Sequence, residues 1–232
     1  MSSIFQCEHL SKDFGNTLAL NDLNLSLESG RIVGLLGPNG SGKTTLLKLA
    51  NGLLQPTSGA IFLDGMEPGV ETKAIVSYLP DANYLPLWMR VDGLLQMFAD
   101  FYSDFNMEKA EAMLTQLNIH GRDRLKTLSK GNKEKVQLIL AMSREAKIYL
   151  LDEPIGGVDP AARDYILNTI IQNYSENALV VISTHLIADI ERVLDEVVFI
   201  SQGSAVFHRS VDEIRETEHK SVDEVFREVF RC

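Results

Sequence analysis

The alternation of hydrophobic and polar positions changes its period along the chain, and each change predicts a strand or a helix. Apolar and polar residues alternate over 23–27, which predicts a half-buried strand. Residues 31–36 form a short apolar run between glycines and predict a buried strand. Apolar residues then recur at helical spacing over 46–54, and Pro-Thr-Ser-Gly at 56–59 ends the predicted helix.

The rest of the chain alternates between short apolar runs and amphipathic segments. Four further strands are predicted, at 60–63, 148–151, 179–182 and 197–200. Between them, residues of about 84–145 have no clear strand pattern and predict a helical insertion. Buried strands that alternate with helices indicate an α/β fold with a mainly parallel sheet covered on both faces. Near the end, Ser210 and Ser221 each begin a similar short segment, which predicts two serine-capped helices.

Composition and charge restrict the classes of protein that fit. The chain has 232 residues, 45% of them hydrophobic and 23% charged, which fits one ordinary globular domain and excludes a disordered or fibrous protein. A net charge of −10 argues against a nucleic-acid partner. Cys7 and Cys232 form no disulfide framework, and no signal peptide or membrane-spanning segment is evident, so we expect a cytoplasmic protein.

The strongest local motif is a phosphate-binding loop between a predicted strand and a predicted helix. Residues 37–44 fit the pattern G-x-x-x-x-G-K-[ST]. Its glycines let backbone N–H groups converge on phosphate, Lys43 reaches the terminal phosphates, and the Thr44 hydroxyl ligates Mg²⁺. The predicted nucleotide-binding residues of this segment are Gly37, Pro38, Asn39, Gly40, Ser41, Gly42, Lys43, Thr44 and Thr45.

An acidic partner for the metal follows the strand at 148–151. Asp152 ends this apolar run, at the edge of the sheet where α/β proteins bind ligands. Glu153 comes next and is either a general base for water or a solvated acid; the apolar strand and Pro154 favour the base.

Further motifs resemble those of the ABC transporter ATPases. Leu-Ser-Lys-Gly-Asn at 128–132 is similar to the signature motif, Asp-Glu-Pro at 152–154 to the end of the Walker B strand, and Gly-Val-Asp at 157–159 to the D-loop. Ser-Thr-His at 183–185 resembles the switch histidine motif. These motifs occur in the family's order and cover nearly the whole chain.

The resemblance implies a P-loop NTPase core, an antiparallel N-terminal β subdomain, and two chains that sandwich two ATP molecules head to tail. Ser129 and Gly131 would then bind the ATP held by the partner's phosphate loop, although Ser129 is also explained as a plain N-cap. The resemblance also implies that His185 contacts the γ-phosphate and that Phe14 stacks on adenine. Judged without the family resemblance, His185 would be interpreted as a structural residue and Phe14 as a core residue.

The sequence departs from the family pattern at three positions. Lys130 and Asn132 replace the usual glycine and glutamine of the signature motif, and Asp81 stands where a glutamine near the metal is usual. We expect Thr44, Asp152 and, through a bridging water, Asp81 to surround Mg²⁺. The alternative for Asp81 is that it caps the turn after Pro80.

We therefore expect one ABC ATPase domain over residues 1–232, with ATP and Mg²⁺ as ligands and Glu153 and His185 as catalytic residues. The resemblance implies a homodimer, or a heterodimer with a similar subunit, bound to a separate membrane permease on the cytoplasmic face. The signature form resembles ABC-2-type exporters. Residues 83–89 either face that permease or fill the core.

Two other functions are the alternatives. One is a non-transport ABC ATPase that acts on ribosomes or DNA, and the other is a P-loop kinase for a small molecule.

Overall fold

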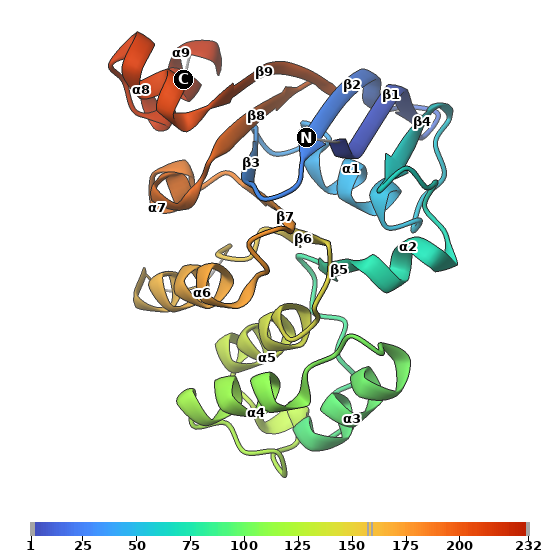
Figure 1. The fold of residues 1–232 in the computed structure, drawn as a ribbon, viewed down its shortest axis with the longest axis vertical. Helices are drawn as coiled ribbons and strands as arrows, with labels where there is room; N and C mark the ends of the chain where they lie inside the picture. Colours follow the sequence, from blue (N-terminus) through green and yellow to red (C-terminus); the bar gives the residue numbers. More distant parts are fainter. Residues whose placement is uncertain (1–2, 157, 159, 231–232) are drawn as a thin grey trace.

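A six-stranded sheet forms the centre of the molecule (Figure 1). The computed structural model describes residues 3–156, 158 and 160–230, and only the backbone of 160–162. Across the sheet the strands are β5 (Val76–Leu79), β6 (Ile148–Asp152), β7 (Leu179–Thr184), β3 (Ile32–Leu36), β8 (Glu196–Ser201) and β9 (Ser204–Ser210). The first five run parallel, and β9 is antiparallel to β8.

The central strands are covered on both faces. Every residue of β3, β6 and β7 is buried, which explains why these strands are continuous apolar runs in the sequence. The strands predicted at 31–36, 148–151, 179–182 and 197–200 are confirmed to within about two residues at their ends.

A second, antiparallel sheet is built from the N-terminal third of the chain. Its order is β2 (Leu18–Glu28), β1 (Ser3–Asp13) and β4 (Ser58–Leu63). Leu23, Leu25 and Leu27 of β2 are buried, as their alternation predicted. They share one hydrophobic core with the nearer face of the central sheet and with helix α1 (Lys43–Ala50), which lies between the two sheets.

Helix α1 ends earlier than the sequence predicted. The helical spacing extends to Leu54, but the last helical residue is Ala50. Gly52 has φ +66°, a left-handed conformation that glycine adopts without strain, and Leu53 is 59% exposed. The left-handed glycine turns the chain away from the helix axis. Leu53 therefore does not join the buried apolar face of α1 that its helical spacing predicted.

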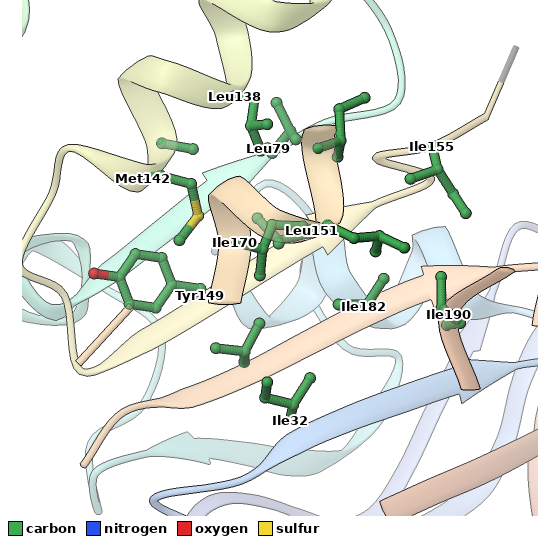
Figure 2. Packing of buried hydrophobic residues seen from close by; sticks show 14 of the residues in the cluster. Ile32, Leu79, Leu138, Met142, Tyr149, Leu151, Ile155, Ile170, Ile182 and Ile190 are labelled. Atoms are coloured by element: carbon green, nitrogen blue, oxygen red, sulfur yellow. The ribbon is translucent and has the colours of Figure 1, made fainter. Parts of the chain in front are cut away.

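Helices cover the other face of the central sheet. Leu138 and Met142 of α5 (Lys130–Met142) and Ile170 of α6 (Pro160–Asn173) pack with Leu151 and Ile182 of the sheet (Figure 2). The helices α3 (Val91–Phe101) and α4 (Met107–Gln116), with the short 3-10 turn η1 (Leu125–Thr127), lie beside α5 at one end of the molecule (Figure 1).

The last part of the chain follows β7 and includes the strands β8 and β9. It contains α7 (Ile187–Ile190), η2 (Glu191–Val193), α8 (Val211–Glu218) and α9 (Val222–Phe230). The hydroxyls of Ser210 and Ser221 accept hydrogen bonds from the N–H groups three residues later, so both serine caps are confirmed. Phe226 and Phe230 of α9 pack against Phe199 of β8, so these apolar side chains lie on the domain itself.

Several elements had no clear signal in the sequence. The strand β1, the edge strands β5 and β9 and the short helix α2 (Val70–Ile75) were not predicted as separate elements. β5 has only four residues and carries Ser77 and Tyr78, and β9 has no fully buried residue, so neither gives a clean apolar run. None of the helices in the described part of the chain is both long enough and apolar enough to cross a membrane.

Candidate ATP-binding site

The phosphate-binding loop lies between the end of β3 and the start of α1. The Lys43 ammonium donates to the carbonyl oxygens of Gly37 (2.7 Å) and Pro38 (3.1 Å), so the loop curves around its own lysine. Thr44 and Thr45 follow in the first turn of α1, whose N-terminal N–H groups and positive dipole end favour an anion. The predicted loop is therefore formed, with its cation at its centre.

Two glycines of this loop stand where a side chain has no room. A Cβ on Gly37 would lie 2.4 Å from the carbonyl oxygen of Ile200. Gly42 has φ +112°, and a Cβ there would lie 2.5 Å from the carbonyl oxygen of Ala19. The loop thus fits tightly between β8 and the beginning of β2. The hydroxyl of Ser41, also in the loop, is buried with no partner among the described residues, a polar group that a phosphate would satisfy.

Asp152 lies at the carboxyl end of β6 and is almost completely buried. Its Oδ1 accepts two hydrogen bonds, from the Thr44 hydroxyl (3.1 Å) and from the Ser183 hydroxyl (2.5 Å). Its Oδ2 is buried and has no partner among the described residues. A buried carboxylate oxygen without a donor is costly unless a cation or a further donor reaches it.

The charges of this site perturb one another. Burial raises the pKa of Asp152; hydrogen bonds from Ser183 and Thr44 act in the opposite direction, and the carboxylates of Asp81 and Glu153 raise the pKa further. Burial also lowers the pKa of Lys43, against the attraction of Glu153 and Asp152. The site therefore holds partly desolvated charges of both signs.

Glu153 has a left-handed backbone, with φ +50°, which is strained for a residue with a side chain. Hydrogen bonds hold it there: its N–H donates to the Ser183 carbonyl at 3.0 Å, and its own carbonyl accepts from Gly156 N–H at 3.0 Å. The strain turns the carboxylate away from the strand direction and toward the end of β7. Such outliers persist where the surrounding structure fixes them, which is common at functional sites.

The Glu153 carboxylate is oriented by the last residue of β7, Thr184, and by the residue after it, His185. The Thr184 hydroxyl donates to Oε2 at 3.0 Å, and His185 Nδ1 lies 3.0 Å from Oε1. Because Nδ1 is used in this contact, Nε2 of His185 remains available for a ligand. Glu153 and His185 are thus adjacent, as expected for a base and a phosphate contact in one site.

The donors present fit a magnesium ion. Mg²⁺ prefers oxygen ligands and is usually held by one or two protein groups together with phosphates and waters. The Thr44 hydroxyl and the unpartnered Oδ2 of Asp152 are such groups, and among the described residues no cluster of three or more His, Cys, Asp or Glu forms a separate all-protein site.

Comparison with known proteins identifies the family. Residues 20–156, more than half of the chain, match the family model described as "ABC transporter". This chain belongs to the ABC transporter family. It is an ATP-binding and ATP-hydrolysing subunit that energises transport, as the motifs predicted.

Two bacterial relatives match this ABC ATPase over most of their length. The ABC transporter ATP-binding protein YtrB of Bacillus subtilis is 30% identical over 92% of this chain and 74% of its own. The protein named SkfA peptide export ATP-binding protein SkfE, also of Bacillus subtilis, is 30% identical over 86% of each chain.

Solved structures agree with the fold. A structure described as an ATP-binding subunit of an ABC transporter has a TM-score of 0.87 and 28% identity and covers 98% of this chain and 100% of its own. A dimeric ATP-binding cassette in a post-hydrolysis state with ADP and Pi has a TM-score of 0.77 over 89% of this chain and 98% of its own; at 19% identity it supports the fold alone. The predicted α/β fold is confirmed.

Other predicted site residues of this ABC ATPase lie apart from the central group. Ser129 is the N-cap of α5, where its hydroxyl accepts from Asn132 N–H at 3.2 Å. No hydrogen bond among the described residues joins Ser129 or Gly131 to the phosphate loop. Phe14 lies in the turn between β1 and β2 and is 55% exposed, so it is not a core residue. Asp81 is exposed beyond the end of β5 and influences Asp152 only through its charge.

Part of one predicted motif lies outside the described residues. The D-loop prediction at 157–159 rests on Gly157 and Asp159, which are not among them.

Two residues of the site were missed as contributors. Ser183 and Thr184 were noted only as part of the motif around His185, yet one binds Asp152 and the other binds Glu153. One signal in the sequence could have found them: two hydroxyl residues stand at the end of a predicted buried strand. Both side chains are completely buried, and a buried hydroxyl needs a hydrogen-bond partner.

We expect Asp152→Asn to stabilise the nucleotide-free protein at neutral pH. Folding raises the pKa of Asp152 above its ordinary 3.8, so the ionised carboxylate disfavours the folded state at any pH above that value. The neutral amide removes this cost while its oxygen still accepts from Thr44 and Ser183. Each kcal/mol of this free-energy cost that is removed raises Tm by about 2–4 °C in a domain of this size. The gain shrinks as the pH falls toward 4, because wild-type Asp152 then becomes protonated.

Thermal unfolding between pH 4 and 8 measures this effect. Glu216→Gln, which neutralises an exposed carboxylate on α8, is the matched control and should change Tm little. An Asp152→Asn variant that is less stable than the wild type at pH 7.5 would contradict the stated sign.

Proposed function

We propose that Glu153 is the general base for ATP hydrolysis, that Thr44 and Asp152 hold Mg²⁺, and that two chains complete two ATP sites. The observation that carries this proposal is the Asp152 carboxylate. One of its oxygens binds both the phosphate-loop helix and β7, and the other is buried without a partner. When bound, Mg²⁺ would neutralise charge on the β- and γ-phosphates.

The side chains around Glu153 support its role as the base. Its carboxylate accepts from Thr184 and contacts His185, so its orientation is set before a substrate arrives. In that orientation Glu153 would accept a proton from the water that attacks the γ-phosphate, and Nε2 of His185 would donate to a γ-phosphate oxygen. Lys43 would exchange its loop carbonyl partners for phosphate oxygens.

The signature helix would supply the second half of the partner's ATP site. Helix α5 has no acidic residue in its first turn, and Lys130 and Lys133 lie there instead. The free N–H groups at the start of α5, the Ser129 hydroxyl and the adjacent Gly131 would together favour an anion. A head-to-tail dimer, between identical or similar subunits, would bring this helix end to the ATP of the other chain.

Exposed apolar side chains support a contact with a membrane subunit. Trp88 is 75% exposed, Phe101 77%, Leu87 48% and Tyr84 46%, all within the helical segment 84–145, which we propose to be an inserted subdomain. A separate integral membrane permease would cover this surface, with the ATPase on the cytoplasmic face of the membrane. The Leu-Ser-Lys-Gly form of the signature motif supports an ABC-2-type exporter.

We expect Glu153→Gln to keep ATP binding and to slow hydrolysis by about 10²–10⁴-fold, because the positioned base is lost while the shape is kept. An ATP-dependent dimer should then accumulate, because ATP remains intact in the sandwich. Equilibrium ATP binding, steady-state phosphate release, and light scattering with saturating ATP and Mg²⁺ give the three readouts.

Ser129→Arg in the Glu153→Gln background is the control for the dimer. An arginine at this N-cap should abolish the dimer without weakening ATP binding by the monomer, since Ser129 makes no contact with its own phosphate loop. A Glu153→Gln variant that hydrolyses ATP at the wild-type rate would exclude Glu153 as the base. If Ser129→Arg left the dimer intact, the signature contact would be wrong.

We expect Asp81→Asn to weaken the apparent Mg²⁺ affinity in the ATPase assay by a fewfold and to leave metal-free ATP binding unchanged or slightly improved. The Asp81 carboxylate acts on Asp152 through its charge, so it favours a bound cation and opposes a bare triphosphate. Asp100→Asn, on the exposed face of α3, is the control. An unchanged Mg²⁺ titration curve would show that Asp81 has no role at the metal.

A further inference from the structure

We infer that Thr57 is a positioning residue for the base end of the nucleotide: its hydroxyl fixes the turn that carries Phe14. This inference rests on the proposed contact between Phe14 and adenine. Thr57 lies in the segment between α1 and β4 and belongs to none of the motifs that identify the family. It is nevertheless hydrogen-bonded to the residue immediately before Phe14.

Packing alone does not fix the position of Phe14. Its ring is 55% exposed, and among the described residues the ammonium of Lys12, 5.1 Å from the ring centroid, is the only cation or aromatic ring found against it. The ring therefore takes its place mainly from the backbone of the turn. That turn is closed by two hydrogen bonds: Phe14 N–H donates to the Thr17 carbonyl at 3.0 Å, and Gly15 N–H donates to Asp13 Oδ1 at 2.7 Å.

Thr57 binds Asp13, the last residue of β1 and the one before this turn, with its hydroxyl acting both as acceptor and as donor. Oγ1 accepts from Asp13 N–H at 3.0 Å and lies 3.4 Å from the Asp13 carbonyl oxygen, to which it donates. The backbone N–H of Thr57 also donates to the carbonyl of Ser11 at 2.9 Å. Asp13 in turn accepts from Gly15, so the hydroxyl, Asp13 and the turn form one connected set of hydrogen bonds.

The segment around Thr57 is itself held firmly against β1. Two residues later, Gly59 has φ +74°, and a Cβ there would lie 2.1 Å from the carbonyl oxygen of His9. This contact leaves no room for the segment to shift toward β1. Thr57 is therefore a fixed point from which the turn is positioned.

The same segment is connected to the phosphate loop through helix α1. That helix begins at Lys43 and ends at Ala50, seven residues before Thr57, and it lies beside the N-terminal sheet (Figure 1). A bound ATP must reach from Lys43 to Phe14 at once. Thr57 thus helps to set the distance between the two ends of the site, which a preorganised binding site requires.

Two substitutions separate the hydroxyl from the rest of the residue. Thr57→Val keeps the β-branched shape and the N–H bond to Ser11 but removes the hydroxyl, whereas Thr57→Ser keeps the hydroxyl. We expect Thr57→Val to weaken ATP binding about two- to tenfold, the range for one lost hydrogen bond. Thr57→Ser should restore most of the affinity.

Inorganic triphosphate is the probe that tests position along the nucleotide. It contacts the phosphate loop and has no base, so isothermal titration calorimetry should give the same affinity for Thr57→Val and for the wild type. Equal weakening of ATP and inorganic triphosphate would show a general structural defect and overturn the inference.

The Phe14→Ala background tests whether Thr57 acts through Phe14. In that background Thr57→Val should cause no further loss of ATP affinity. A loss that persists there would overturn the inference. If Phe14→Ala weakens ATP binding and Thr57→Val does not, only the role of Thr57 is wrong. If Phe14→Ala leaves ATP affinity unchanged, the proposed adenine contact is wrong, and the role of Thr57 is wrong with it.

Discussion

The rest of the site depends on the hydrogen bonds that the Asp152 carboxylate accepts. It lies at the end of β6, almost fully buried, and one of its oxygens binds the Thr44 hydroxyl from the phosphate-loop helix and the Ser183 hydroxyl from β7. Two hydroxyls on one oxygen connect three elements that are distant in the sequence. The other oxygen is buried without a partner, and burial raises the pKa of this carboxyl, so this part of the site is arranged for a cation at the expense of stability.

The parallel sheet makes this arrangement possible. In the register of β6 and β7, Asp152 pairs with Ser183, so the residues after them meet at the same edge. Glu153 leaves the strand with a left-handed backbone, and Thr184 and His185 leave β7 beside it. The orientation of the proposed base is therefore set by the neighbouring strand, whose hydroxyls are buried and fully used.

The parts of the site that local patterns encode could be predicted from the sequence. The phosphate loop, Asp152 at the end of an apolar run and Ser129 at a helix start each depend on a few neighbouring residues. Contacts across the sheet were missed, because the partnership of Ser183 with Asp152 depends on strand order and register, which no local pattern records.

The fold shows the same division between local and long-range information. Buried parallel strands were predicted because each contains a run of at least four apolar residues, interrupted at most by one glycine, whereas the short edge strand β5 has no such run and was not predicted. Helix α1 was predicted too long because Leu53 and Leu54 continue the helical spacing past Gly52, where the backbone turns left-handed. The contact of Thr57 with Asp13 gave no signal, since Asp13 lies 44 residues away in β1.

The most direct test of the account is the effect of Mg²⁺ on ATP affinity in Asp152→Asn. If the free oxygen of Asp152 is what the metal requires, the wild type should bind ATP more tightly with Mg²⁺ than without it, and Asp152→Asn should lose this gain while it still binds metal-free ATP. Calorimetric titration of both proteins with ATP, in excess Mg²⁺ and in excess chelator, measures the gain. An Asp152→Asn variant that keeps the full wild-type gain would contradict the central role of this carboxylate.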